Sequence, residues 1–287
     1  MSSGGLIVSI DFELNWGYND AANPLRPEQV DEGLDRLKVL LDRYEIRSTW
    51  ATVGGLFAPV VGKEDQPPGL WNRAEWIANN LASDPKVEIG SHTFSHLFLK
   101  ESAREAVEAD FEEMQQLQSL GYRFETLVFP RNQYDDDLVR TAHRYGVRTY
   151  RGVRPLWYEQ SSKFTDEAIS LKLVRRAQEL LPRERFARVT KQDGVTEITD
   201  SRFFRFFSAT AAGNLLTRVY RPILRRELTV AIRKGQYYHI WFHPHNLIVK
   251  PYRYGELEAF FRHFATLRDR YGARSLHMGD VAAEVAC

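Results

Sequence analysis

Short apolar segments alternate with longer amphipathic segments along most of this chain. Residues 6–12 form a continuous, β-branched run, which is typical of a strand buried on both faces of a sheet. From residue 27 onward, Val30, Leu34 and Leu37 recur on one face of a helix. Regular alternation of strands and helices favours a parallel sheet, open or closed into a barrel. We predict further strands at residues 47–53, 87–90, 124–129, 147–150, 194–198 and 237–242, and helices at 71–81, 103–120, 136–145, 171–181, 222–234 and 257–271.

The length of 287 residues predicts one domain, residues 1–287, because single α/β barrels often have this size. A looser pattern at about residues 155–236 predicts an elaboration of that domain. The formal net charge of +1 provides no basic field, so nucleic acid is not an expected partner. The only cysteine, Cys287, is the last residue, which excludes a disulfide framework and a thiolate metal site.

The sequence carries no recognisable targeting segment. No secretion signal precedes the first strand, and no run of eighteen apolar residues occurs anywhere. We therefore expect a chain with no transmembrane segment and a cytoplasmic location.

Residues that suit a metal site follow three of the predicted strands. Asp11 and Glu13 close the first strand, and because they lie two residues apart, both carboxylates can point to one face. His92 and His96 follow a strand, and a helical turn would bring residues four apart onto one side. In parallel α/β folds, functional groups collect at the carboxyl ends of the strands. The predicted site therefore contains Asp11, Glu13, His92, His96, His243 and His245.

Each pair of residues also has a structural interpretation. Asp11 and Glu13 alone are as expected for a helix cap and a solvated charge, and His92 and His96 alone fit hydrogen-bonded groups at a strand end. Their common order along the chain, at three strand ends, favours the metal site over these alternatives. The remaining histidines in helical or terminal segments are expected to be structural: His143, His263 and His277.

Several motifs resemble those of the polysaccharide deacetylase (NodB-homology) superfamily. They are IVSIDFE at residues 7–13, TWATVG at 49–54, GSHTFSH at 90–96 and IWFH at 240–243. The first motif resembles the branch of that superfamily with acid-x-acid in place of two adjacent aspartates. The resemblance implies an incomplete (β/α) barrel of the seven-stranded type, with an irregular insertion before the last strands. It also implies a divalent metal held by one carboxylate and two histidines, and hydrolysis of an N- or O-acyl group on a carbohydrate.

The resemblance also implies roles for individual residues. His92 and His96 match the ligand histidines, and His243 matches the general acid. Asp11 is assigned as the base and Glu13 as the third ligand, although the two roles could be exchanged. Two nitrogens and one carboxylate suit zinc first, and also cobalt, iron or nickel. No clear counterpart of the aspartate that orients the acid histidine is found.

Three further residues are expected to contact substrate. Arg131 lies where the family has an Arg/Pro/Tyr segment, but it is displaced by about one residue. Arg151 ends a strand, where a substrate contact and a solvated side chain are equally consistent with the sequence. His245 follows Pro244 and suits a substrate contact or support of the metal ligands.

The arginine-rich stretch at residues 201–234 predicts an anion contact. Its aromatics are expected to cap the open side of the barrel, whereas the excess of arginine suits phosphate oxygens. We expect Arg202 first among them to contact a phosphate-bearing or anionic carrier attached to the sugar. The cluster comprises Arg202, Arg205, Arg218, Arg221, Arg225 and Arg226.

These features predict a metal-dependent hydrolase that removes an N-acyl group, acetyl or formyl, from a carbohydrate. The expected substrate is an acylated sugar, nucleotide- or lipid-linked, in surface polysaccharide biosynthesis. Two alternatives are a cyclic amide or ureide hydrolase of the same superfamily and a catalytically silent glycan-binding module. The combination of Asp11, His92, His96 and His243 argues against the silent module, because a binder needs no acid, base and metal together.

Overall fold

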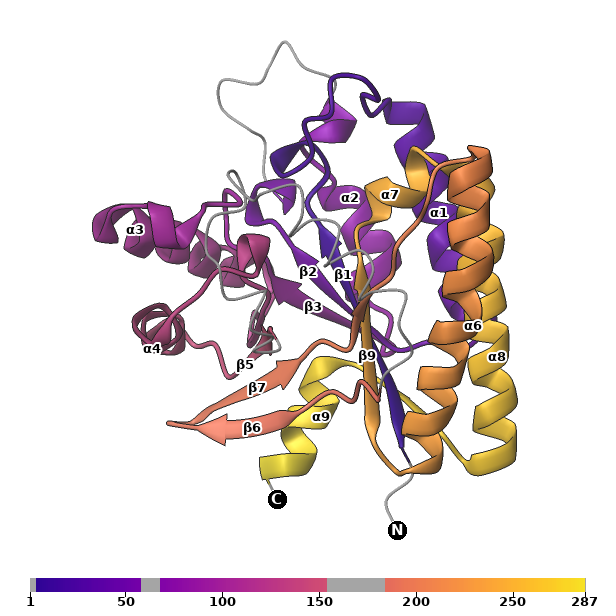
Figure 1. Ribbon diagram of the computed structural model, residues 1–287. Coiled ribbons are helices and arrows are strands. Elements are labelled where there is room, and N and C mark those ends of the chain that lie inside the picture. The colour runs from indigo at the N-terminus through magenta and orange to yellow at the C-terminus, as the bar shows by residue number, and fades with distance from the viewer. Residues whose placement is uncertain (1–3, 58–67, 154–183, 287) are drawn as a thin grey trace, which may run out of the picture.

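The computed structural model describes residues 4–57, 68–153 and 184–286. A mostly parallel, twisted sheet runs through the molecule, with helices packed around it (Figure 1). Strand β1 (Gly5–Phe12) lies between β2 and β9, and the order along the sheet is β6-β7-β5-β4-β3-β2-β1-β9-β8. Only β6 and β7 pair antiparallel among the described strands. The other strands are β2 (Ser48–Thr52), β3 (Val87–Ser91), β4 (Thr126–Leu127), β5 (Thr149–Gly152), β6 (Val189–Gln192), β7 (Val195–Thr199), β8 (Arg202–Phe203), β9 (Tyr237–Phe242) and β10 (Arg274–Leu276).

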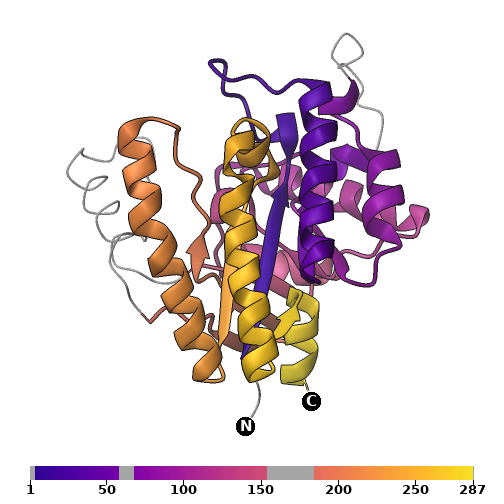
Figure 2. The same ribbon diagram turned by 90° about the vertical axis from the view of Figure 1, so that its right-hand side faces the viewer.

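Three long helices cover the outer face of β1 and β9, as Figure 2 shows from that side: α1, α6 and α8. Helix α1 begins at Pro27, a residue whose fixed φ suits the first helical position, and it buries the predicted apolar face. Helices α3 and α4 lie beside β3–β5 (Figure 1). The helices are α1 (Pro27–Arg43), α2 (Ala74–Ile77), α3 (Arg104–Gln116), α4 (Asp136–Arg144), α6 (Ala211–Arg233), α7 (Pro244–Ile248), α8 (Tyr254–Tyr271) and α9 (Met278–Ala286). Short helical turns lie at Leu14–Trp16, Gly54–Phe57, Pro68–Leu70, Ala78–Ala82, Leu99–Glu101, Leu117–Leu120, Pro130–Asn132 and Pro251–Arg253.

The segment that contains β7 and β8 joins the two sides of the sheet. Strand β7 pairs with β5, and β8, which follows after only Asp200 and Ser201, pairs with β9. The hydrogen-bonded ladder is not continuous across these two residues, so the sheet does not close. This arrangement confirms the predicted incomplete (β/α) barrel.

Side chains of β1 alternate between an outer core and the barrel interior. The even positions, including Val8, Ile10 and Phe12, join the large apolar cluster under the long helices. The odd positions face the other way: Ile7 packs against α9 in a separate apolar cluster, and Ser9 and Asp11 follow above it. The interior therefore has an apolar base next to α9 and polar layers toward the carboxyl ends of the strands.

Some element boundaries differ from those expected. Helix α6 begins at Ala211 rather than at Pro222, because the Thr210 hydroxyl caps it by accepting from the Gly213 N–H. Pro222 therefore lies inside the helix. The helix expected at residues 71–81 is divided into α2 and a π-helical turn. The helix expected at residues 171–181 lies outside the described residues, as does part of the predicted elaboration. Each helix that the structure does describe is too short or too polar to span a lipid bilayer.

Candidate metal and catalytic site

The predicted ligand residues come together at the carboxyl ends of β1 and β3. The Oε2 atom of Glu13 lies 2.9 Å from Nε2 of His96 and 3.4 Å from Nε2 of His92. All three side chains are largely buried. One ligand atom from each residue lies within 4.8 Å of the other two, and no other such group of three occurs among the described residues. This donor set, a carboxylate and two imidazoles, fits a divalent transition metal and leaves room for further ligands.

The histidines converge through a tight loop and not through a helical turn, so the expected helical spacing is wrong. Thr93 and His96 have φ angles of 62° and 59°, which belong to the left-handed region. Asp110 of α3 holds this loop: it accepts from the Phe94 N–H at 2.7 Å and from the Ser95 N–H at 2.9 Å. Asp110 was not identified from the sequence, although an acid between apolar residues on the buried face of a helix was a usable signal.

His92 has a fixed tautomer. Its Nδ1 donates to the Val128 carbonyl at 2.7 Å, which leaves Nε2 facing Glu13. Metal-binding histidines commonly have such a second hydrogen bond to orient the ring. Burial, the largest single influence, disfavours the charged imidazole, but the hydrogen bond to Glu13 and the charges of Asp11 and Glu13 together outweigh it and raise the pKa of His92. Burial would raise the pKa of the Glu13 carboxyl, but His243, His92 and His96 together hold that pKa well below its usual value.

Asp11 is ion-paired with Arg151, which comes from β5. The guanidinium donates from Nη1 to Oδ1 at 2.6 Å and from Nη2 to Oδ2 at 2.8 Å. Both side chains are almost completely buried. Burial alone would raise the pKa of Asp11, but the charge and hydrogen bonds of Arg151, with the nearby His92 and His243, together outweigh it and lower that pKa. Asp11 is thus held as a carboxylate beside the group of Glu13, His92 and His96.

The expected substrate contact of Arg151 is not supported. Its side chain is 1% exposed, and its donors are directed to Asp11, Ser9 and the Oδ1 atom of Asn132. The guanidinium also lies over the Trp241 ring, 4.2 Å from its centroid. Asn132 reaches it from a turn with a left-handed φ of 52°. The arginine is therefore neither solvated nor open to a ligand.

His243 and His245 lie on the other side of Glu13. Nε2 of His243 is 3.6 Å from Oε1 of Glu13 and 3.8 Å from Oδ2 of Asp11. Nδ1 of His245 is 3.7 Å from the same Glu13 oxygen, and the two imidazoles stack with centroids 4.7 Å apart. Burial, reinforced by His243, lowers the pKa of His245 to about 3, so this ring is neutral. His245 also packs against the Tyr18 ring in a tilted arrangement, with centroids 4.4 Å apart.

Arg131 lies at the margin of the site. Its guanidinium is 3.5 Å from the centroid of the Phe98 ring, and that ring packs against His96. The Arg131 side chain is exposed, and its backbone has a left-handed φ of 55°. A bulky residue adopts this conformation rarely, so the surrounding structure must hold the turn that presents the Arg131 side chain.

Arg202 lies elsewhere, and its expected substrate contact is not supported. Its Nε and Nη2 atoms donate to the Glu227 carboxylate of α6 at 2.8 and 2.7 Å. Both side chains are 2% exposed, and the Tyr238 hydroxyl donates to the same carboxylate. This pair joins the barrel to α6 on the outer face of β9.

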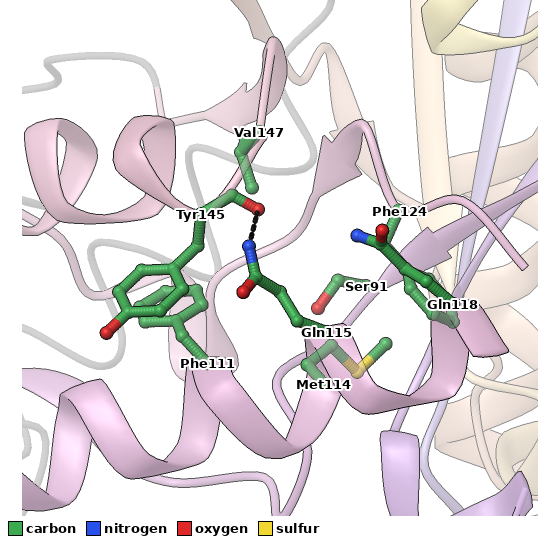
Figure 3. Close-up of a pocket in the computed structure, with 8 residues that line it drawn as sticks. All are labelled: Ser91, Phe111, Met114, Gln115, Gln118, Phe124, Tyr145 and Val147. Carbon is green, nitrogen blue, oxygen red and sulfur yellow. Dashed lines mark hydrogen bonds between the residues drawn. The ribbon is translucent and has the colours of Figure 1, made fainter.

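A small cavity between α3 and the sheet is separate from this site (Figure 3). Ser91, Gln115 and Tyr145 are among its lining residues, and the Gln115 amide donates to the Tyr145 carbonyl at 3.1 Å. The cavity has room for about 10 Å³, which is close to the space of one water molecule. It is too small for a sugar.

Comparisons with known proteins agree with the sequence motifs. The model of the polysaccharide deacetylase family matches residues 26–150, which confirms the resemblance. That match includes His92 and His96, whereas Asp11, Glu13 and His243 lie outside it. No curated protein matches the sequence significantly.

Solved structures share the fold at low identity. A candidate polysaccharide deacetylase from Mycobacterium smegmatis is 16% identical, with a TM-score of 0.59 over 99% of this chain and 91% of that one. The Puue allantoinase is 12% identical, with a TM-score of 0.57 over 98% of this chain and 90% of that one. The α-amylase AmyC from Thermotoga maritima is 11% identical, with a TM-score of 0.56 over 91% of this chain and 71% of that one. At these identities the similarity shows a common fold.

Proposed function

Because residues 26–150 match the polysaccharide deacetylase family, we propose that this chain is a metal-dependent hydrolase that removes an acetyl or formyl group from a sugar nitrogen. The family match supports a deacetylase-type hydrolase. The observation that carries the finer proposal is the convergence of Glu13, His92 and His96 beside the Asp11–Arg151 pair. In this proposal the metal ligands, the base and the acid lie within one small volume.

In this proposal Glu13, His92 and His96 hold a divalent ion, zinc first among the candidates. The ion would supply a Lewis acid for the substrate carbonyl and would lower the pKa of water toward neutrality. His92 is already oriented for binding by the Val128 carbonyl. The position of Glu13 between both imidazoles supports its assignment as ligand, while Asp11, engaged by Arg151, is the base.

The protein groups provide the proton transfers. Asp11 would accept a proton from the attacking water, and the Arg151 guanidinium would keep its carboxylate ionised and in place. His243, on the opposite side of Glu13, would donate a proton from Nε2 to the leaving nitrogen. An amide needs this second step, because an amine anion is a poor leaving group.

The identity of the sugar, its role in surface polysaccharide biosynthesis, a nucleotide or lipid carrier and a cytoplasmic location stay predictions from the sequence. A mass-spectrometric screen of N-acetylated and N-formylated sugars and sugar nucleotides would test the sugar, the acyl group and the nucleotide carrier. Loss of the acyl mass in the presence of wild-type protein, but not of Asp11→Asn, is the expected result. A complete absence of turnover across metals and substrates would contradict the proposal.

A cyclic amide hydrolase is the second candidate, because an allantoinase shares the fold with a TM-score of 0.57. Ring opening needs the same base and Lewis acid, whereas the product nitrogen stays attached to the rest of the substrate. Including allantoin in the same screen distinguishes the two reactions. Turnover of the cyclic ureide without turnover of acylated sugars would favour this second candidate.

Metal binding provides a test that requires no substrate. His92→Ala and His96→Ala are each expected to abolish stoichiometric uptake of zinc, because each removes one of three protein ligands. Metal content after dialysis, measured by mass spectrometry, is the readout. His263→Ala is the control, because His263 contacts Thr229 on the outer helices. Metal content at the wild-type level in both site variants would place the metal elsewhere.

Arg131 is proposed to contact the substrate at the mouth of the site. Arg131→Met is expected to raise KM for an anionic sugar substrate by roughly 10-fold or more with kcat nearly unchanged, since a hydrogen bond to a charged group contributes about 1.5–3 kcal/mol. Arg104→Met, which removes an exposed arginine on α3, is the matched control. Equal KM values for Arg131→Met and the wild type would show that Arg131 does not contact the substrate.

A further inference from the structure

A buried hydroxyl–imidazole pair lies directly beneath Asp11. The Ser9 Oγ atom of β1 is 2.9 Å from Nε2 of His239 on β9, and both residues are 0% exposed. Nη1 of Arg151 donates to the same Ser9 oxygen at 3.0 Å. On the far side, Nδ1 of His239 lies 3.3 Å from the Thr199 carbonyl. These contacts connect Arg151 to the backbone at the end of β7.

Only one direction of proton donation fits all these contacts. The Thr199 carbonyl can only accept, so in the neutral ring Nδ1 of His239 is the donor and Nε2 accepts from the Ser9 hydroxyl, which in turn accepts from Arg151. Nε2 is then unprotonated, and Nδ1 carries the hydrogen that is donated to the Thr199 carbonyl. The chain runs from guanidinium to hydroxyl to neutral imidazole to carbonyl.

The surroundings keep His239 in that neutral form. Burial, with the Arg151 charge, lowers the pKa of His239 to about 3. A protonated imidazole could not accept from Ser9 and would face the cation of Arg151. The direction of the chain is therefore fixed near neutral pH.

Arg151 uses every N–H group that it has. Nε donates to Asn132 at 3.2 Å, Nη1 donates to Ser9 and Asp11, and Nη2 donates to Asp11 and Asn132. Asn132 fixes one edge of the planar guanidinium, and Ser9 fixes the other. Without the Ser9 contact, the plane could rotate away from that of the Asp11 carboxylate.

We propose that Ser9 and His239 are positioning residues that hold Arg151 in the plane of the Asp11 carboxylate. They touch neither substrate nor metal, and they act through Arg151. The kinetic consequence rests on the proposed function: a base displaced by a fraction of an ångström loses alignment with water, so kcat falls while KM is largely unchanged. The geometric consequence, the mobility of the guanidinium, is independent of any reaction.

Two variants at His239 test the chain. His239→Ala removes the acceptor of Ser9, whereas His239→Gln can restore it, because the amide offers an oxygen to Ser9 and an N–H to Thr199. Nitrogen-15 NMR of the arginine side chains is the first readout: four separate, slowly exchanging Nη–H signals are expected for Arg151 in wild type, identified by their loss in Arg151→Lys. We expect averaged signals in His239→Ala, and separate ones in His239→Gln. With an active substrate, kcat is expected to fall roughly 10–10²-fold in His239→Ala and to recover in His239→Gln.

Ile240→Ala is the matched control. Ile240 is the next residue of β9, it is equally buried, and it faces the outer apolar core. Its truncation opens a cavity in the same strand but should leave the Arg151 signals unchanged. If His239→Ala does not fold, Ser9→Ala replaces it, because this variant deletes only one hydroxyl group.

Separate, wild-type Arg151 signals in a folded His239→Ala or Ser9→Ala protein would overturn the proposal. Averaged signals in Ile240→Ala as well would also overturn it, since strand packing alone would then hold the guanidinium. Failure to find a substrate leaves the NMR result decisive, so failure of the proposed function and failure of this inference are distinguishable.

Discussion

Asp11→Asn is expected to lower kcat by roughly 10²–10⁴-fold, the usual range for loss of a general base. An amide cannot accept the proton of the attacking water, although it occupies the same space beside Arg151. Zinc content should be unchanged, because Glu13, His92 and His96 are intact. The measurement is single-turnover or steady-state hydrolysis of the substrate found in the screen, together with metal analysis of the same preparation.

His243→Ala removes the proposed general acid, and we expect it to lower kcat by a factor of similar size. Nε2 of His243 lies within 4 Å of both carboxylates, so its removal should spare the metal but not the reaction. The loss should be larger for substrates with poor leaving groups than for activated aryl esters, because the aryl oxide of such an ester leaves without protonation. His263→Ala is the control for histidine removal far from the site. A near-normal rate in either site variant would exclude that residue from the mechanism.

Arg202→Met is expected to lower the free energy of unfolding by about 3–5 kcal/mol, because removal of one member of a buried ion pair leaves the other uncompensated. The guanidinium makes two hydrogen bonds to Glu227, and both side chains are 2% exposed. Urea unfolding monitored by tryptophan fluorescence gives the difference. The double variant Arg202→Met/Glu227→Leu should regain most of the loss, since two apolar side chains can replace such a pair.

Arg274→Met serves as the comparison for Arg202. Arg274 pairs with Glu284 at the surface, with side-chain exposures of 38% and 35%. Solvent and salt weaken such a pair, so its loss should cost only about 0–1 kcal/mol. Equal effects of the two substitutions would show that burial of the Arg202–Glu227 pair has little energetic importance.

Local patterns in the sequence predicted the long helices and the central strands, whereas β6, β8, β10, α7 and α9 were not predicted. Val30, Leu34 and Leu37 recur with helical spacing, and each is fully buried in α1. Gly121, directly after the helix predicted at residues 103–120, ends the helical segment after α3 with a left-handed φ of 89°. Such features depend on neighbours within one or two turns, so the sequence contains the information directly.

Contacts between distant residues were not predictable in the same way. Arg151 and Asp11 are 140 positions apart, and Ser9 and His239 are 230 apart. Nothing in the residues around Arg151 distinguishes a buried partner of Asp11 from a substrate ligand. Arg202 was assigned to an anion for the same reason, because its acidic partner Glu227 follows only on the next helix. The order of motifs brought Glu13, His92 and His96 together, whereas the left-handed loop that does so has no local signature.

The alternation along β1 also determines which acid pairs this strand can carry. Asp11 and Glu13 face the interior, while the intervening Phe12 points outward against the rings of Trp50 and Trp76, with centroids 5.3 and 5.8 Å away. An aspartate introduced at position 12 would bury its charge against these two indole rings, and burial of an unpaired charge is very unfavourable. Two adjacent acids are therefore inaccessible to this chain by point substitution. The insertion of one residue before Asp11 would disturb the strand more, because every side chain after the insertion would move to the opposite face of the sheet.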